Sequence, residues 1–293
     1  MIENSRNIPL VLGTATFGNT YGIANRNELQ NNQMVNDLVV IAEKAGIEFF
    51  DSAPAYGNAE SLLGRYRDSS RSIKVISKIG AEESLDFDLM LKSVQRSLER
   101  IGVPRLWALL LHDSRALERN TSDKTIWALN SILESRLVER IGISVYSADE
   151  AIQAKAKFPT LSVFQIPENV CDRRASTSDE LLSLSQNGNS FFVRSIFLQG
   201  LLLMEANELP ENLSRAGKFI EQIKFLAEQN STNSLSICLS YANSIPWASG
   251  IIIGAATKEQ LQDIIVASRN LKIDWTNEID TMDNWLIDPR NWS

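Results

Sequence analysis

The sequence predicts a single-domain α/β fold, a (β/α)8 TIM barrel. Eight short apolar runs rich in Val, Ile, Leu and Phe alternate with longer segments in which apolar residues recur every three or four positions. Such alternation is typical of repeated strand-helix units around a parallel sheet. Barrels of this type commonly occupy about 250 residues as one unit. We therefore assign residues 1–293 to one domain.

The eight predicted strands are the apolar runs. No G-x-G-x-x-G sequence follows the first run, which argues against an open dinucleotide-binding sheet. The runs are IPLVLGT from Ile8, IEFFDSA from Ile47, IKVISKI from Ile73, RLWALLLH from Arg105, RIGISVY from Arg140, LSVFQIP from Leu161, SFFVRSI from Ser190 and SGIIIGA from Ser249.

The segments between the runs read as helices. Residues 36–46 have helical apolar spacing and end at a glycine, which is typical of a helix C-terminus. In residues 87–102 we expect one buried stripe, formed by Leu89, Val94, Leu98 and Ile101.

The last two connections are unusual. Residues 197–248 contain two helix candidates, 210–229 and 231–244, so we expect an extra helix and a loop that covers a cofactor. The tail at about 270–293 carries three of the six tryptophans and is expected to pack across one end of the barrel.

Composition limits the function classes. The net charge is -7 and no long basic cluster occurs, which argues against a nucleic-acid partner and favours a small ligand. No stretch of 18 apolar residues could span a membrane, and the N-terminus lacks a secretory signal, so we expect a cytoplasmic protein. Cys171 and Cys238 are far apart without C-x-x-C spacing, which predicts core thiols and no metal site.

Polar residues end three successive predicted strands. Asp51 ends the second, Lys78 ends the third, and His112 ends the fourth; Tyr56 follows Asp51 in the next loop. The active sites of such barrels lie at this C-terminal rim. Taken singly, Asp51 could cap a helix, Lys78 could be a solvated charge, and Tyr56 and His112 could be structural. We expect the four together to form a site.

The four side chains suit carbonyl chemistry. A free phenol has a pKa near ~10, and a nearby ammonium lowers such a pKa. Lys78 is therefore expected to tune Tyr56 as a proton donor, with Asp51 holding Lys78 and His112 orienting a carbonyl oxygen. No serine nucleophile with a paired base is apparent, and one histidine cannot build a multi-histidine metal centre.

These motifs resemble those of the aldo-keto reductases. The segments FFDSAPAYGNAESLLG, KVISK and LLLH are similar to the family's signature stretches, and the resemblance covers nearly the whole chain. It implies reduction of an aldehyde or ketone with a nicotinamide cofactor. The implied catalytic set is Asp51, Tyr56, Lys78 and His112.

The resemblance also implies a cofactor site. In RIGISVYS and FQIPENV it assigns two side chains to the nicotinamide carboxamide, with Val145 where the family has asparagine; in FVRSIFLQGLLL an arginine stands where an aromatic ring usually stacks on nicotinamide. The segment IIIGAATKEQLQDII resembles the adenosine-binding region, and Lys258 and Arg269 are candidate partners for a 2'-phosphate. The cofactor residues so implied are Ser144, Gln165, Arg194, Ser195, Leu198, Gly200, Gly254, Thr257, Lys258, Gln260 and Asp263.

The expected cofactor is NADP(H), with NAD(H) as the alternative. LGTATFGNTYGIANRNE and VRSIFLQGLLL are similar to a bacterial branch linked to sugar or polysaccharide biosynthesis, which implies a polar sugar or nucleotide-sugar carbonyl as substrate. Two other functions stay open at this stage. One is a nucleotide-binding sensor or regulatory subunit with weak catalysis, and the other is a lyase or epimerase that uses Lys78 as a Schiff base.

Overall fold

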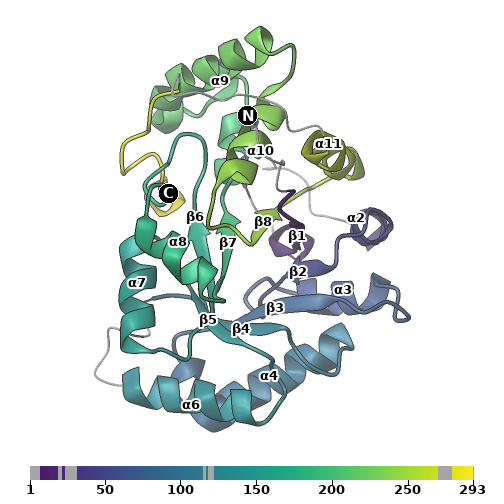
Figure 1. Ribbon diagram of the computed structural model, residues 1–293. Helices are drawn as coiled ribbons and strands as arrows, with labels where there is room; N and C mark the ends of the chain where they lie inside the picture. The colour runs from purple at the N-terminus through teal and green to yellow at the C-terminus, as the bar shows by residue number, and fades with distance from the viewer. Residues whose placement is uncertain are drawn as a thin grey trace.

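The computed structural model describes residues 7–18, 22–23, 32–114, 117, 122–269 and 279–292. Eight parallel strands close into a barrel in chain order, with β1 hydrogen-bonded to both β2 and β8 (Figure 1). The (β/α)8 prediction is thus confirmed. The strands are β1 (Leu10–Gly13), β2 (Phe49–Asp51), β3 (Lys74–Ile79), β4 (Ala108–Leu111), β5 (Ile141–Ser144), β6 (Val163–Pro167), β7 (Ser190–Arg194) and β8 (Gly250–Ile253).

Helices surround the barrel (Figure 1). They bury their apolar faces against the outer surface of the strands in one large cluster of side chains. The α-helices are α1 (Ala15–Gly18), α2 (Asn32–Lys44), α3 (Ala59–Tyr66), α4 (Phe87–Ile101), α6 (Ser122–Glu134), α7 (Ala148–Lys157), α8 (Asp179–Gln186), α9 (Gly217–Gln229), α10 (Ser234–Ser244) and α11 (Lys258–Ser268). Short 3-10 helices are η2 (Glu83–Leu85), η3 (Leu198–Leu203), η4 (Ala206–Glu208), η5 (Glu211–Ala216) and η6 (Pro289–Asn291).

The predicted stripe of α4 is wrong at one position. Leu89 is 49% exposed, whereas Met90 is fully buried. Asp86 caps the helix through the backbone N–H groups of Asp88 and Leu89. This cap fixes where the first turn begins, so Met90 and not its neighbour faces the strands together with Val94, Leu98 and Ile101.

A second, smaller cluster of apolar side chains is formed by residues on the strands themselves. Phe49, Trp107 and Phe192 pack in it with ring centroids 5.0 to 5.7 Å apart. Because side chains alternate across a strand, these residues share the inner face of the barrel. Its buried members are Val11, Ile76, Ala108, Leu110, Val163 and Phe192.

The connection from β7 to β8 contains the expected extra helix, α9, ahead of α10. Residues 279–292 of the tail pack against it: Ile279 and Leu286 are buried, and Arg215 forms an ion pair with Asp283 at 3.1 Å. Residues 270–278 of the predicted tail lie outside the described residues. Cys171 and Cys238 are buried free thiols.

Candidate active site

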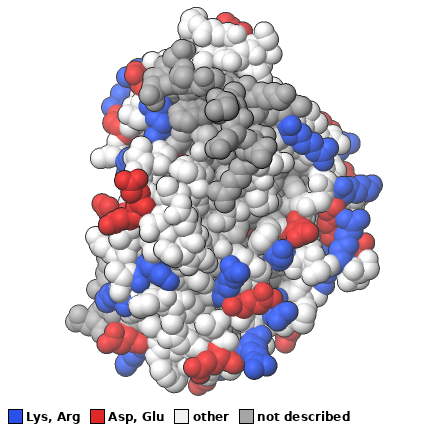
Figure 2. Space-filling model, in the orientation of Figure 1, with Lys and Arg blue, Asp and Glu red and all other residues white. Residues whose placement is uncertain are grey.

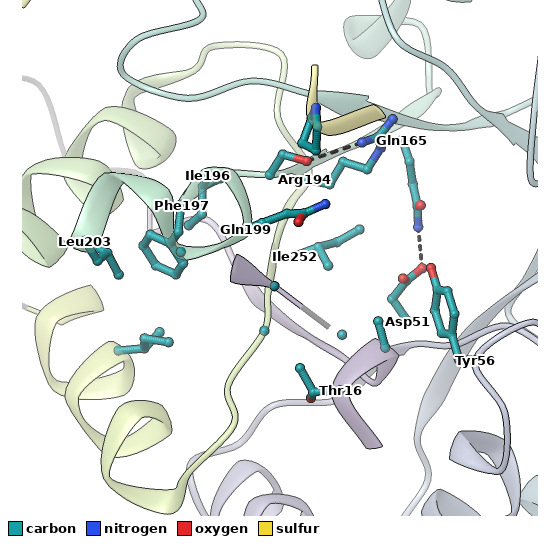
Figure 3. A pocket seen from close by; sticks show the side chains of 18 of the residues that line it. Thr16, Asp51, Tyr56, Gln165, Arg194, Ile196, Phe197, Gln199, Leu203 and Ile252 are labelled. Atoms are coloured by element: carbon teal, nitrogen blue, oxygen red, sulfur yellow. Dashed lines mark hydrogen bonds between the residues drawn. The ribbon is translucent and has the colours of Figure 1, made fainter. Parts of the chain in front are cut away.

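The pleat of the strands determines which polar side chains point into the barrel mouth. Side chains two positions apart on a strand lie on the same face. A polar residue two positions after an inward-facing apolar residue therefore also points inward, one layer nearer the C-terminal rim. Asp51 follows Phe49, Lys78 follows Ile76, and His112 follows Leu110 in this way. The same step from Val163 to Gln165 and from Phe192 to Arg194 places polar side chains on the opposite wall, as Figure 3 shows for both.

Asp51 and Lys78 form a buried ion pair. Nζ of Lys78 lies 2.7 Å from both Oδ1 and Oδ2 of Asp51 and also donates to the Ser52 carbonyl at 3.2 Å. Burial alone would lower the pKa of the ammonium, but attraction to Asp51 and then to Tyr56 outweighs it, so the pKa of Lys78 is raised. Lys78 therefore keeps its positive charge inside the protein.

Tyr56 reaches this pair from the loop after β2. Nζ of Lys78 lies 5.0 Å from the centre of the Tyr56 ring. The ring also packs edge-on against His112, with centroids 5.9 Å apart. The four residues predicted for catalysis are thus brought together in the structure, and Asp51 is not a helix cap, because α3 begins only at Ala59.

The Tyr56 loop is held by close packing from β1 and α1. The hydroxyl of Thr14 donates to the Asp51 carbonyl at 3.1 Å and to Oγ of Ser52 at 2.8 Å. Gly18 lies against the loop so closely that an added Cβ would stand 2.1 Å from the Tyr56 carbonyl oxygen. A glycine is therefore required for the backbone to approach Tyr56 at this distance.

His112 is neutral near pH 7. Burial, followed by repulsion from the Lys78 ammonium, lowers its pKa to about 4. A neutral imidazole has one N–H donor and one acceptor, although which nitrogen carries the proton depends on its partners. The side chain can therefore donate a hydrogen bond to an oxygen beside Tyr56.

Gln165 of β6 joins the opposite wall to the ion pair. Its Nε2 donates a hydrogen bond to Oδ1 of Asp51 (Figure 3). Ser144 of β5 is paired with Gln165 in the strand register, and both are buried at the cavity wall. Val145 packs in the core and does not line the cavity, because it faces away from the barrel interior.

Arg194 ends β7 and is held by its neighbours. One guanidinium nitrogen donates to the Val145 carbonyl at 2.9 Å, and the group lies 4.6 Å from the centre of the Tyr146 ring. Its Nε is buried and has no hydrogen-bond partner among the described residues. A buried donor left unpaired costs free energy, so the contacts that hold Arg194 in place leave one of its donors unsatisfied.

The next turn of the chain is strained. Ser195, Leu198 and Gln199 have φ values of 63°, 48° and 56°, a region that residues other than glycine rarely adopt, and Gly200 has φ 91°. Such conformations cost of order 1–3 kcal/mol each and gather at ligand-binding segments. Ser195, Gln199 and Gly200 line the cavity, whereas Leu198 is buried in the core.

The segment after β8 forms the far end of the cavity. Gly254, Gln260 and Asp263 line it. Thr257 instead caps α11 by accepting from the Gln260 N–H at 3.2 Å, and Lys258 is exposed beside Glu259, 3.7 Å away. Neither Thr257 nor Lys258 lines the cavity.

These residues enclose one continuous cavity of about 690 Å³, within the size range of small-molecule and cofactor sites. It extends from Asp51, Tyr56, Lys78 and His112 to Gln260 and Asp263 on α11. Among the described residues, no group of three or more His, Cys, Asp or Glu side chains could hold a metal ion.

Sequence reasoning missed several residues that line the cavity, among them Tyr146 and Arg290. Tyr146 lies two positions after Ser144, and this spacing places it at the same mouth. Arg290 of η6 lies 3.6 Å from the Tyr146 ring centre and is bound by the Asp288 carboxylate. No local pattern marks Arg290, because 144 residues separate it from Tyr146 and only the docking of the tail brings them together.

The comparisons with known proteins agree with this geometry. The model of the aldo/keto reductase family matches residues 9–284. The chain belongs to the aldo/keto reductase family. It is accordingly an oxidoreductase of the class that reduces carbonyl compounds.

Curated relatives of this aldo/keto reductase act on small oxygenated molecules, as their names state. It is 26% identical over 287 residues to L-glyceraldehyde 3-phosphate reductase of Escherichia coli, covering 83% of this chain and 81% of that protein. It is 24% identical to the NADH-specific methylglyoxal reductase of the same organism, covering 80% and 82%. It is 28% identical to D-arabinose 1-dehydrogenase of Saccharomyces cerevisiae, but that match covers only 48% of this chain and 44% of that protein.

Solved structures share the fold. A thermostable aldo-keto reductase crystallised with the inhibitor epalrestat superposes with a TM-score of 0.69 at 21% identity, covering 89% of both chains. An aldo-keto reductase of Pseudomonas aeruginosa gives a TM-score of 0.64 at 19% identity, covering 90% of both. Within the described part of the chain, no helix is both long and apolar enough to cross a membrane.

Proposed function

We propose that this aldo/keto reductase reduces an aldehyde or ketone to an alcohol with a nicotinamide cofactor and with Tyr56 as the proton donor. One observation carries the proposal: Asp51, Tyr56, Lys78 and His112 meet at one wall of the large cavity.

The residues around the cavity fit a dinucleotide. A Cβ placed on Gly254 would meet nothing within 4 Å, so the backbone there borders open space that a ligand can approach closely. Ser144 and Gln165 offer hydroxyl and amide groups near the ion pair, and the Arg194 side chain lines the same cavity. Ser195, Gln199 and Gly200 supply the strained backbone between the two ends. A nicotinamide held here would supply a hydride to the substrate carbonyl.

The protein's own groups would manage the proton and the developing charge. Tyr56 Oη donates the proton to the oxygen of the carbonyl as it gains negative charge. The charged Lys78 next to Tyr56 favours the phenolate left behind, and Asp51 holds Lys78 in place. Neutral His112 donates a hydrogen bond to the same oxygen, which stabilises the charge before the proton arrives.

The substrate proposed is a small, polar carbonyl compound such as a sugar or nucleotide sugar. The rim around Tyr56 carries Tyr146, Arg194 and Arg290, which can hydrogen-bond hydroxyl or phosphate oxygens. The named relatives that act on glyceraldehyde 3-phosphate, methylglyoxal and arabinose support this class. Membership of a branch serving polysaccharide biosynthesis stays a prediction.

The test is a panel of sugar aldehydes, sugar phosphates and short ketoaldehydes, each incubated with the purified protein and NADH or NADPH. We expect stoichiometric oxidation of the nucleotide and formation of the alcohol with at least one small polar substrate. Tight nucleotide binding with no turnover across the panel would contradict the enzyme function and support a regulatory protein. Borohydride trapping of substrate on Lys78 would support Schiff-base chemistry instead.

A further inference from the structure

A hydrogen bond between two side chains crosses the mouth of the barrel. Asp51 ends β2 and Gln165 lies on β6, and these strands stand half a turn apart in the closed barrel. Nε2 of Gln165 donates to Oδ1 of Asp51 across the interior, although the two residues are 114 positions apart in the sequence. Figure 3 shows the Gln165 side chain pointing at Asp51, with Tyr56 beside it. The ion pair of Asp51 and Lys78 is therefore contacted from both sides of the barrel.

The chemistry of the partners fixes the direction of this hydrogen bond. Asp51 is paired with the Lys78 ammonium, so its two oxygens act as acceptors. The amide nitrogen of Gln165, and not the amide oxygen, must therefore face the carboxylate. Asp51, Lys78 and Gln165 are only 4%, 3% and 1% exposed, so water would replace a lost donor poorly.

Lys78 alone does not orient the Asp51 carboxylate. Its Nζ lies 2.7 Å from each of the two oxygens, so the contact is symmetrical, and it comes from β3, the strand next to β2. Gln165 adds a contact to one oxygen from the opposite wall. Two contacts from different directions fix the plane of the carboxylate, and with it the place where the ammonium lies beside the Tyr56 ring.

The same hydrogen bond changes the charge that Tyr56 experiences. The positive field of Lys78 at Tyr56 is opposed by the negative charge of Asp51. An amide N–H on the carboxylate offsets part of that negative charge. The net positive field at Tyr56 is therefore stronger with Gln165 in place than without it, which favours loss of the phenol proton.

We propose that Gln165 is a positioning residue for proton transfer. It holds the ion pair of Asp51 and Lys78 through its hydrogen bond to Asp51, and in this way sets the pH range in which Tyr56 can donate its proton. The inference rests on the proposed function, because it concerns the proton that Tyr56 gives to the substrate. A contact between Gln165 and the nicotinamide carboxamide is compatible with it, since that hydrogen bond to Asp51 leaves the amide oxygen unused. Such a contact alone, however, would act on nucleotide binding and not on the pH dependence of kcat.

The experiment separates these two effects in Gln165→Met, which keeps the length of the side chain but has no N–H donor. The pH dependence of kcat in the direction of reduction is measured with saturating nucleotide and the best substrate of the panel. The dissociation constant of the nucleotide is measured separately. Ser144→Ala is the matched control, because Ser144 pairs with Gln165 in the strand register and lines the same cavity. Circular dichroism melting checks that each variant is folded.

We expect Gln165→Met to lower kcat by about 10- to 100-fold, as a small displacement of a catalytic group does. The pH above which kcat falls should rise by about 0.5 to 1 unit, because the field at Tyr56 is weaker. Ser144→Ala should weaken nucleotide binding and leave this pH unchanged. Gln165→Glu, the second variant, should be impaired at neutral pH by repulsion from Asp51. It should regain activity as the pH falls, because its carboxyl group can donate once it is protonated.

Two results would overturn the inference and leave the reductase function standing. One is a folded Gln165→Met protein with the wild-type pH dependence, in which only nucleotide binding has changed. The other is a Gln165→Glu protein that regains no activity at low pH, and this result decides the question if Gln165→Met does not fold. Absence of turnover by wild type across the panel would overturn the proposed function and the inference together.

Discussion

The ammonium of Lys78 lies 2.7 Å from both carboxylate oxygens of Asp51, and both side chains are almost fully buried. A pair this deep is costly to desolvate and contributes little to stability compared with apolar packing. The position of the ion pair beside Tyr56 explains it better: the pair keeps one positive charge next to the proton donor. The charges on the face in Figure 2 are, by contrast, mixed and exposed.

The Lys78→Met variant tests whether the positive charge of Lys78 tunes Tyr56. Loss of the ammonium should reduce kcat by about 10²- to 10⁴-fold, the range that general acid-base catalysis contributes, and should change the pH profile of the remaining activity. It should also destabilise the fold by about 3–5 kcal/mol, because Asp51 is left buried without its partner. Denaturant unfolding with steady-state kinetics measures both. An unchanged pH profile in a folded Lys78→Met protein would refute the tuning role.

The His112→Gln variant tests whether the imidazole of His112 is neutral in the folded protein. The pKa of His112 in the folded protein, about 4, lies below the ordinary value of 6.5, so between these pH values the unfolded chain takes up a proton that the folded chain does not. The contribution of His112 to the free energy of unfolding is therefore complete above pH 6.5 and is lost as the pH falls toward 4, by at most roughly 3 kcal/mol.

The measurement compares unfolding of wild type and His112→Gln between pH 4 and 7. Since the chain has a single histidine, this part of the pH dependence should disappear in the variant. Wild-type activity between pH 5 and 7 should show no loss attributable to protonation of His112. Equal slopes of stability against pH in the two proteins would mean that His112 is protonated as in free solution.

Gly18→Ala tests whether packing from α1 sets the position of Tyr56. The new methyl group would lie 2.1 Å from the Tyr56 carbonyl oxygen, so the loop must move. Because a displacement of about 1 Å can cost about 10²-fold in rate, we expect kcat to fall by about 10- to 100-fold. Gly217→Ala is the control, since a methyl group there meets its nearest atoms at 3.7 Å and the backbone is helical. Similar kinetics for both variants would refute the positioning role.

Much of the fold, and the meeting of the four residues predicted for catalysis, could be predicted from the sequence. Eight apolar runs became eight strands, and the rule that strand ends meet at one rim brought Asp51, Lys78 and His112 together. These features follow from local periodicity and barrel closure. The exposure of Leu89 could not be predicted as reliably, because it depends on where the Asp86 cap begins the helix.

The residues proposed to hold the cofactor were harder to predict, because segments with similar sequences can direct their side chains differently. Leu198 lies in a strained turn that directs it into the core, and Thr257 is used to cap α11. Arg290 reaches the rim only through tertiary packing of residues 279–292. Side-chain direction in such segments is set by the turn and by distant contacts, and neither leaves a periodic signal.

The most direct test of the central claim is Tyr56→Phe, measured with the best substrate of the panel. Removal of the Tyr56 hydroxyl should lower kcat by at least about 10²-fold. Tyr56 is the proton donor that we assign next to Lys78 and His112, and the variant lacks its proton. The dissociation constant of the nicotinamide nucleotide should stay within about threefold of wild type. A Tyr56→Phe protein that keeps wild-type kcat would contradict the assignment of Tyr56 as the proton donor.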